Sequence, residues 1–585
     1  MVINSPHGPL PELPLANIHD TIFRRPGAPE IPDHVSQIDA RTGEQRTRKA
    51  FIELIRDGAT ALSSSIDDGG LGLRGDKGRM VGILSFNSLN YIALVHSLFI
   101  IATPFVPLSA HSTSSELAFL LSKSGATHIF VESTLLPKML GTIRDAGISD
   151  DRILLLDEPR ASPNLGGIRS FDSLIKAICK RNIPRADVRS VGKDTLAYLM
   201  FSSGTSGLPK AVAVSHANVN TSLMQYLMLV VEAMKVMKLS AVPGEISKVL
   251  AALPFSHTAG LHVLVIRALL LPNTLVILPK WDVNMAIDCI QKYRISSLFI
   301  VPSMIHTLVH SERFAKADLS SLTGLGTGAA HFPPALGQRL LSKPGLGSSR
   351  LSIGYGLSEA TVGAIYSPPE GILGGRIKDV PKDTTGILVP GMQARIVKED
   401  GTDASVNEPG ELWLKGPAVT MGYWNDEERT KETFLPDGWL RTGDRFRIDE
   451  RGYFFSVFDS FEDRLKDTLK VSGLQVSPAE IEDVLISQPD GLIIDASVSG
   501  VSGSRTSDEK SPRAWVVLSK SGRKVGKEQV AAKLNAWVEE NLSKYKWLRG
   551  GIEFVDEIPK NAAGKVLRRL LVDEYEKSRS GRAHL

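Results

Sequence analysis

The sequence is poor in cysteine and in net charge. Its 585 residues include only two cysteines, Cys179 and Cys289, which lie far apart and lack metal-ligand spacing. A disulfide framework and a zinc site are therefore not expected, and a reducing compartment fits this composition. The formal net charge is +4, and nucleic-acid-binding domains show clustered lysine and arginine instead. We therefore expect no nucleic-acid partner.

The sequence also lacks a signal-peptide pattern and an unbroken membrane span. The N-terminal residues show no basic region followed by an apolar core. The most apolar window, residues 91–110, is interrupted by His96, Pro104 and Pro107. It predicts a buried helix that leads into a buried strand, and no transmembrane segment.

What is present is the composition of a large globular protein. Hydrophobic residues make up 42% and charged residues 23%, and the length exceeds a single hydrophobic core. Strand-like runs alternate with helical patterns over about 80–360, which predicts α/β layers. Gly-rich turns after residue 385 indicate a more twisted β region. A charged stretch after Glu462 precedes a small separate α/β unit, so we predict domains at 1–462 and 463–585.

The stretch FSSGTSGLPK, residues 201–210, raises the first functional question. Glycine N–H groups, four hydroxyls and the ammonium of Lys210 make a cradle for a multiply charged anion such as phosphate. Apolar strand patterns lie on both sides, so the loop joins two strands and differs from the usual strand-to-helix phosphate loop. A serine- and glycine-rich hairpin with a solvated lysine explains the same residues.

Four further stretches carry polar residues of functional type. IGYGLSEAT (353–361) could stack a base and hold a metal-bound phosphate, or could be a turn before a helix. WLRTGDRFRIDERGY (439–453) places Asp444 after a Thr-Gly turn, where it could accept hydrogen bonds from ribose hydroxyls or form an Asx turn. DRLKDTLKVSG (463–473) and IPKNAAGKVLRR (558–569) are otherwise a charged surface segment and a solvated basic tail.

Together these stretches resemble the adenylate-forming, AMP-binding superfamily, in particular acyl-CoA synthetases similar to 4-coumarate–CoA ligases. The resemblance covers nearly the whole chain. Its motifs, in order, are SSGTSGLPK, LPFSH, GAAH, YGLSEAT, GELWLKG, TGD, DRLK and IPKNAAGK. It implies an α/β fold with a large N-terminal AMP-binding domain and a small, mobile C-terminal α+β domain.

The resemblance assigns roles to residues of the N-terminal part. It implies that ATP phosphates are held by Ser202, Ser203, Gly204, Thr205, Ser206, Gly207 and Lys210. Tyr355 would stack on adenine, Ser358 would touch phosphate and Glu359 would hold Mg²⁺. Gly328 and Gly356 would belong to the same nucleotide site.

The resemblance also implies roles near and beyond the domain boundary. Asp444 and Arg464 would bind the ribose, and Lys565 would bridge the substrate carboxylate and the α-phosphate during adenylation. The small domain would then rotate and present Lys470 and Gly473 for thioester formation with CoA. Lys466 sits where the hinge usually lies.

Several positions depart from the usual family pattern. Ala211 replaces a glycine after Lys210, Ser358 replaces a commoner threonine, and His331 takes the place of a proline. The lead-in before Asp463 is longer than usual, which affects the hinge assignment.

By resemblance, His257 lines the acyl tunnel as a catalytic-site residue, although a histidine in this setting can also be an ordinary core residue. Ala259 stands where hydroxycinnamate ligases commonly have an aromatic residue, which predicts a wider apolar pocket. A medium-chain, branched or aryl carboxylic acid would suit it.

The resulting hypothesis is an acyl-CoA ligase that uses ATP, Mg²⁺ and CoA. One alternative is a stand-alone adenylating enzyme that passes its acyl group to a carrier protein; no carrier domain is expected after Lys565, so that thiol would come in trans. A non-catalytic nucleotide or acyl-ligand binder is the other. The C-terminal Ala583-His584-Leu585 resembles a peroxisomal address, so a peroxisomal location is expected, with the cytoplasm as the alternative.

Overall fold

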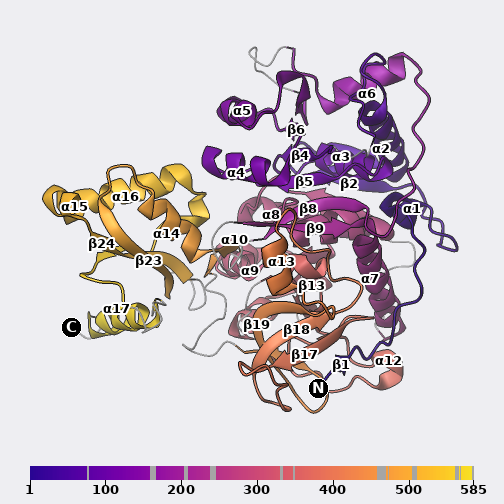
Figure 1. Cartoon of the computed structure of the whole chain (residues 1–585). Coiled ribbons are helices and arrows are strands. Elements are labelled where there is room, and N and C mark those ends of the chain that lie inside the picture. Colours follow the sequence, from indigo (N-terminus) through magenta and orange to yellow (C-terminus); the bar gives the residue numbers. More distant parts are fainter. Residues whose placement is uncertain are drawn as a thin grey trace.

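The computed structural model shows a large body and a smaller one beside it (Figure 1). The described residues are 1–74, 78–158, 167–202, 209–236, 246–329, 334–346, 349–457, 469–471, 474–502, 510–559, 566 and 568–582. The fold is α/β, with the layered sheets in the large body and a small C-terminal α+β unit, as the sequence predicts.

Two mainly parallel sheets form the layered part of the large body. The first has the strand order β7-β6-β4-β5-β8-β9. Its strands are β4 (Val81–Leu84), β5 (Phe105–Leu108), β6 (His128–Val131), β7 (Ile153–Leu155), β8 (Leu196–Ser202) and β9 (Lys210–Ser215). The second has the order β16-β15-β14-β13-β12-β10-β11-β2-β3. Its strands are β2 (Val35–Asp39), β3 (Gln45–Thr47), β10 (Ser247–Ala251), β11 (Asn273–Ile277), β12 (Ser297–Phe299), β13 (Gly324–Thr327), β14 (Arg350–Tyr355), β15 (Ile365–Tyr366) and β16 (Ile387–Leu388).

Helices pack against both sheets, as expected for crossover connections between parallel strands. The helices of the large body are α1 (Ile18–Phe23), α2 (Arg48–Ser63), α3 (Leu89–Ile100), α4 (Ser114–Ser124), α5 (Leu136–Asp145), α6 (Phe171–Lys180), α7 (His216–Val236), α8 (Val283–Tyr293), α9 (Pro302–Val309), α10 (Glu312–Lys316), α11 (Pro334–Leu341), α12 (Ile372–Gly375) and α13 (Glu427–Thr433). Every residue of α3 is buried, and β5 follows it. The buried helix and strand predicted for residues 91–110 are thus confirmed. Among the described helices, none combines the length and the apolar character needed to cross a bilayer.

The predicted twisted β region is a separate antiparallel sheet of order β1-β17-β18-β19-β20. Its strands are β1 (Ile3–Asn4), β17 (Gln393–Val397), β18 (Gly410–Lys415), β19 (Leu440–Ile448) and β20 (Phe454–Ser456). The N-terminal strand β1 pairs with β17, nearly four hundred positions along the chain. Local sequence patterns carry no information about such a pairing, and the sequence analysis did not anticipate it.

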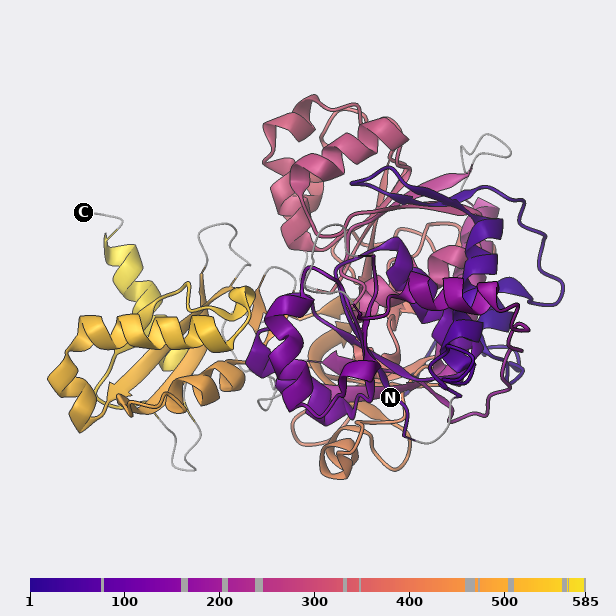
Figure 2. The ribbon, with the colours of Figure 1, turned by 90° about the horizontal axis from the view of Figure 1, so that it is seen from above.

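The small body has its own hydrophobic core, built around two antiparallel strands. Its elements are β21 (Leu469–Val471), β22 (Leu474–Val476), α14 (Pro478–Ile486), β23 (Ile493–Ser502), β24 (Lys510–Leu518), α15 (Lys520–Val525), α16 (Lys527–Asn541), β25 (Ile552–Phe554) and α17 (Arg568–Arg582). Helix α14 begins in the stretch SPAEIEDVL, and α16 begins at Lys527. Figure 1 and Figure 2 both place this body beside the purple helices at one edge of the first sheet.

A buried ion triad joins the two bodies. The ammonium of Lys546 lies 2.7 Å from Glu116 Oε1, at the start of α4, and 2.7 Å from Glu480 Oε1, on α14. The other oxygen of Glu116 accepts the backbone N–H of Thr113 at 2.8 Å and so completes the capping box of α4. The hydroxyl of Ser543 also contacts this oxygen. The Glu116 carboxylate thus caps the N-terminus of α4 and also binds Lys546 of the small body.

The two carboxylates of the triad are not equivalent. Burial acts to raise the pKa of Glu116, but the charge of Lys546 and hydrogen bonds from Lys546 and Ser543 outweigh it, and the pKa falls below its usual range. Burial dominates at Glu480, and its pKa is raised despite Lys546. Glu116 is therefore the more firmly ionised partner across the contact.

We predict that Lys546→Met loosens the contact between the two bodies. Removing one member of a buried ion pair costs about 3–5 kcal/mol, because the remaining charge stays desolvated. Here the carboxylates of Glu116 and Glu480 become hydrated again if the two bodies separate. The lost free energy therefore weakens the contact between the bodies. Small-angle X-ray scattering should show an increased radius of gyration.

Lys533→Met is the matched control, because Lys533 pairs with Asp490 at 2.7 Å on the exposed surface of the small body. Such pairs contribute about 0–1 kcal/mol. Identical scattering from wild type and Lys546→Met would contradict the docking role of the triad.

Candidate active site

A cleft of about 2490 Å³ lies against the large body, and residues from the small body complete its lining. Typical small-molecule pockets measure about 300–1,000 Å³. The cleft is therefore large enough for more than one substrate. Ser202, Lys210, His257, Tyr355 and Glu359 all line it, so the structure brings together motifs spread over more than 150 residues.

The strand-joining loop predicted from FSSGTSGLPK is confirmed. β8 ends at Ser202 and β9 begins at Lys210, and these two residues are directly paired in an antiparallel register. Lys210 is buried, with its ammonium 4.8 Å from the ring centroid of Tyr423. The reading of a solvated hairpin lysine is therefore wrong: Lys210 is held over an aromatic face at the wall of the cleft.

Glu359 is the buried carboxylate of this wall. Its Oε1 accepts a hydrogen bond from the hydroxyl of Ser202 at 3.0 Å and another from Tyr423 at 3.0 Å. Burial and the nearby Glu359 carboxylate raise the pKa of Tyr423, so its phenol remains a donor at neutral pH. Three parts of the sequence thus meet at one carboxylate oxygen.

Ser358, the neighbour of Glu359, bonds to the segment that follows β10. The hydroxyls of Ser358 and Thr258 lie 2.6 Å apart. Adjacent His257 lines the cleft, and burial, with a smaller contribution from His111, lowers its pKa to about 4. His257 is therefore neutral at physiological pH.

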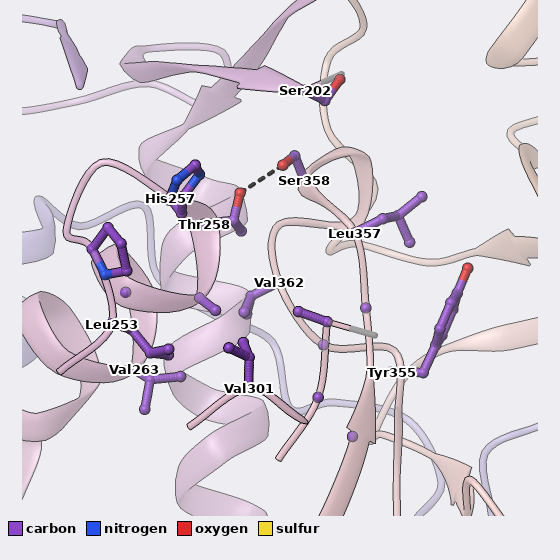
Figure 3. A pocket seen from close by; sticks show the side chains of 18 of the residues that line it. Ser202, Leu253, His257, Thr258, Val263, Val301, Tyr355, Leu357, Ser358 and Val362 are labelled. Atoms are coloured by element: carbon purple, nitrogen blue, oxygen red, sulfur yellow. Dashed lines mark hydrogen bonds between the residues drawn. The ribbon is translucent and has the colours of Figure 1, made fainter. Parts of the chain in front are cut away.

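Apolar side chains gather on one side of this hydrogen bond. Figure 3 shows Leu253, Val263, Val301 and Val362 on the side away from Ser202. The cleft thus has a polar part around Ser202 and Glu359 and an apolar part beyond His257 and Thr258. This division suits a charged nucleotide on one side and an acyl chain on the other.

Tyr355 and Asp444 are joined directly. The Tyr355 hydroxyl donates to Asp444 Oδ2 at 2.7 Å, and its ring packs edge-on against Phe446 with 4.8 Å between centroids. Burial first, and the Asp444 carboxylate second, raise the pKa of Tyr355 well above its usual value. The ring is held in place by its edge neighbour and its hydroxyl.

The local structure at Asp444 differs from the predicted turn. Thr442, Gly443 and Asp444 lie inside the long strand β19. Gly443 has φ of 68° and donates its N–H to the buried carboxylate of Glu411 at 2.9 Å. The left-handed conformation, which glycine adopts without strain, fits an irregular pairing of β18 with β19 at Glu411. The local sequence predicts a turn at Gly443, but in the structure this glycine lies in a β-bulge.

Two glycines of the predicted nucleotide site stand where the backbone leaves no room for a side chain. A Cβ on Gly328 would lie 2.7 Å from the carbonyl oxygen of Gly354, and one on Gly356 would lie 1.6 Å from that of Val362. Both residues line the cleft. Close packing of backbone against backbone explains why these positions carry glycine.

Several predicted site residues lie outside the described residues. They are Ser203, Gly204, Thr205, Ser206, Gly207, Arg464, Gly473 and Lys565, together with Lys466 and His331. Lys470 lies on the described strand β21.

Sequence reasoning missed two residues of the site, Tyr423 and Thr258. Tyr423 lies in the segment MGYWN, which carries no phosphate or metal pattern, and its role arises only through contact with Glu359 and Lys210. Thr258 directly follows the recognised LPFSH motif, so its place beside that motif could have identified it as a site residue.

We predict that Gly356→Ala destabilises the protein and impairs nucleotide use. The new methyl group would overlap the carbonyl oxygen of Val362 and displace the segment that carries Ser358 and Glu359. Gly363→Ala is the control, because a Cβ there meets nothing within 4 Å. Thermal unfolding should show a clear loss for the first variant, and a change within about 0.5 kcal/mol for the second. Equal melting temperatures would contradict the packing argument.

Comparison with known proteins agrees with this site. Residues 46–424 match the family model of the AMP-binding enzymes, and residues 480–565 match that of the AMP-binding enzyme C-terminal domain. A probable 4-coumarate–CoA ligase from Dictyostelium discoideum is 30% identical, over 97% of this chain and 95% of the relative. A peroxisomal OPC-8:0-CoA ligase from Arabidopsis thaliana is 31% identical, over 92% of this chain and 90% of the relative.

A solved structure shows the same fold. ATP-bound MatB from Rhodopseudomonas palustris superposes with a TM-score of 0.62, covers 96% of this chain and 98% of its own, and is 23% identical. The match extends over both bodies of the molecule. With its cleft, its strand-joining loop and its C-terminal unit, the chain belongs to the adenylate-forming AMP-binding enzyme family, among the AMP-forming acyl-CoA ligases.

Proposed function

We propose that the enzyme activates a carboxylic acid with ATP and transfers the acyl group to CoA. A carboxylate oxygen attacks the α-phosphorus, the bond from that phosphorus to pyrophosphate breaks, and acyl-AMP forms. The thiol of CoA then loses its proton, its sulfur attacks the acyl carbon, and AMP leaves. The observation that carries the proposal is the convergence of Lys210, Ser202 and Glu359 beside an apolar cleft.

The described residues would act by placement and charge. Lys210 would neutralise the negative charge on the phosphate groups that leave as pyrophosphate. The ring of Tyr423 lies against its ammonium and would restrict the positions that the ammonium can take. Ser358 would donate to phosphate, with Thr258 orienting its hydroxyl. Charge neutralisation and positioning of this kind account for most of the rate gain in phosphoryl-type transfer.

Tyr355 and Asp444 would hold the nucleoside. The aromatic ring offers a stacking face for adenine, and the Asp444 carboxylate accepts hydrogen bonds from ribose hydroxyls. The hydrogen bond between them fixes both groups before the nucleotide arrives. Arg464 is proposed as a second ribose contact.

Mg²⁺ fits the chemistry of Glu359. This ion is typically held by one or two carboxylates together with substrate phosphates, and Glu359 supplies one such carboxylate at the phosphate end of the cleft. In the described ranges, no three histidine, cysteine or acidic side chains are grouped into a metal site. Bound Mg²⁺ would neutralise phosphate charge, with most of its ligands coming from ATP and water.

The C-terminal unit is proposed to serve both half-reactions. Lys565 would contact the carboxylate and the α-phosphate during adenylation, and the β21–β22 region with Lys470 and Gly473 would face CoA in the second step. We propose a domain boundary between residues 462 and 463, with Lys466 at the hinge. His257, neutral and beside the apolar part of the cleft, would line the acyl tunnel.

The test is a panel of carboxylic acids, including medium-chain, branched and aryl members, with ATP and Mg²⁺. Pyrophosphate release is followed with and without CoA, and acyl-CoA is measured by mass spectrometry. An acid that releases pyrophosphate and yields acyl-CoA supports the proposal. Release without acyl-CoA would favour a carrier protein as acceptor, and no release with any acid would favour a non-catalytic binder.

A peroxisomal location is proposed as well. It is supported by the Ala583-His584-Leu585 sequence, which resembles a receptor-read address, and by the relative from Arabidopsis thaliana that is named as peroxisomal. A fluorescent reporter that ends in these three residues should enter peroxisomes, and one with the final leucine replaced by lysine should not.

We predict that Glu359→Gln raises the Mg²⁺ concentration needed for half-maximal pyrophosphate release. An amide keeps hydrogen bonds but lacks the charge that binds Mg²⁺. Loss even of a group that only orients a metal ligand costs about 10–100-fold in metal affinity, so at least this effect is expected. AMP binding, measured calorimetrically without metal, should change much less.

Glu411→Gln provides the matched control, because Glu411 is also a buried carboxylate that accepts hydrogen bonds, including one from Trp413, but is not among the residues that line the cleft. Its Mg²⁺ dependence should equal that of wild type. If Glu359→Gln weakened AMP and Mg²⁺ binding equally, the metal role would be excluded.

A further inference from the structure

A partly buried arginine lies at the apolar part of the cleft, and no carboxylate among the described residues is its partner. Arg267 lines the cleft and directly follows the π-helix Gly260–Ile266. None of the acidic side chains in the described part of the chain forms an ion pair with it. A buried charge without a counter-ion is costly in free energy. Such a residue therefore indicates the kind of ligand that binds in the adjacent part of the cleft.

The hydrogen bonds of Arg267 are also incomplete. A guanidinium carries five N–H donors. One of its terminal nitrogens donates to the hydroxyl of Ser222, on α7, at 2.7 Å. Its Nε is buried and has no hydrogen-bond partner among the described residues. The ring of Tyr226 lies 5.6 Å from the guanidinium carbon and supplies an aromatic face, which stabilises a cation without satisfying its donors.

The surrounding polar groups are neutral. Burial strongly lowers the pKa of His262, and Arg267 lowers it further, while burial raises the pKa of Tyr198, whose hydroxyl contacts His262. Burial lowers the pKa of Arg267 itself only to about 10, so the guanidinium remains charged at neutral pH. This end of the cleft thus holds one net positive charge.

The position of Arg267 relative to His257 indicates what this charge faces. Ala259, Val263 and Arg267 recur every four residues along one helical segment, and all three line the cleft. Side chains at this spacing share a helix face. An acyl chain that starts beside His257 and runs along Ala259 and Val263 would end at Arg267.

We propose that the acid activated by this enzyme carries a second anionic oxygen group at its far end, and that Arg267 binds that group. The substrate class is therefore an α,ω-dicarboxylic acid or an equivalent acid with a terminal anion, with one carboxylate adenylated and the other paired with the guanidinium. Arg267 is a specificity-determining residue, and this inference rests on the proposed ligase function. Guanidinium groups match carboxylates through paired N–H donors, and the unused donors of Arg267 provide for this.

The experiment compares three acids of equal carbon number: octanoate, ω-hydroxyoctanoate and suberate. Each is assayed for pyrophosphate release and acyl-CoA formation, and its binding to the full-length protein is measured by calorimetry with a non-hydrolysable ATP analogue. We expect suberate to bind about 10–100-fold more tightly than octanoate, in line with a hydrogen bond to a charged group. The hydroxy acid should lie between them, because it offers an acceptor without charge.

Arg267→Met should abolish or reverse this preference and leave octanoate binding unchanged or improved. Arg267→Lys should keep part of it. Arg48→Met is the matched control: Arg48 is buried, donates to the carbonyl of Leu269 at 3.2 Å and lies over Phe23, but it is not among the residues that line the cleft. It should lower the melting temperature without altering the ratio of suberate to octanoate binding.

The outcomes separate this inference from the proposed function. If wild type binds suberate no more tightly than octanoate, or if Arg267→Met leaves the ratio unchanged, the role of Arg267 is overturned even where acyl-CoA is formed. If suberate binds preferentially and the preference depends on Arg267, the inference holds. Absence of pyrophosphate release in that case would reject the ligase function alone.

Discussion

The active site depends on one buried carboxylate oxygen, that of Glu359. It accepts hydrogen bonds from Ser202, at the end of β8, and from Tyr423, in the segment after β18. The ring of Tyr423 in turn lies beneath the ammonium of Lys210, at the start of β9. A buried carboxylate needs hydrogen-bond donors. The donors to Glu359 come from the end of β8 and from the segment after β18, so these hydrogen bonds hold both segments against the YGLSEAT segment.

The positive charges of Lys546 and Arg267 differ in how far the surrounding protein compensates them. At the contact between the bodies, Lys546 has two carboxylates within 2.7 Å, so its charge is compensated by the protein. At the apolar part of the cleft, Arg267 meets the hydroxyl of Ser222 and the ring of Tyr226, and no acidic side chain in the described ranges pairs with it. The first arrangement stabilises a docked orientation, and the second leaves a charge for a ligand to neutralise.

Much of the fold could be predicted from local patterns. Apolar runs such as those of β4, β6, β8 and β11 lie between turn residues, and buried parallel strands require such runs. The phosphate loop and its strand flanks were recognisable for the same reason. The Thr-Gly-Asp segment was misread as a turn, because a glycine at a positive φ looks the same in sequence whether it closes a turn or forms a bulge.

The sequence by itself determined the α/β class, the order of the elements and the residue types of the nucleotide site, because each depends on periodicity and on motifs within a few residues. Tertiary structure alone decided which groups meet: β1 with β17, Tyr423 with Glu359, and Glu116 with Lys546. It also leaves Arg267 without an acid among the residues that the structure describes. These contacts join residues that are far apart in the chain or belong to different elements, and whether a charge finds a partner depends on three-dimensional packing, which no local pattern records.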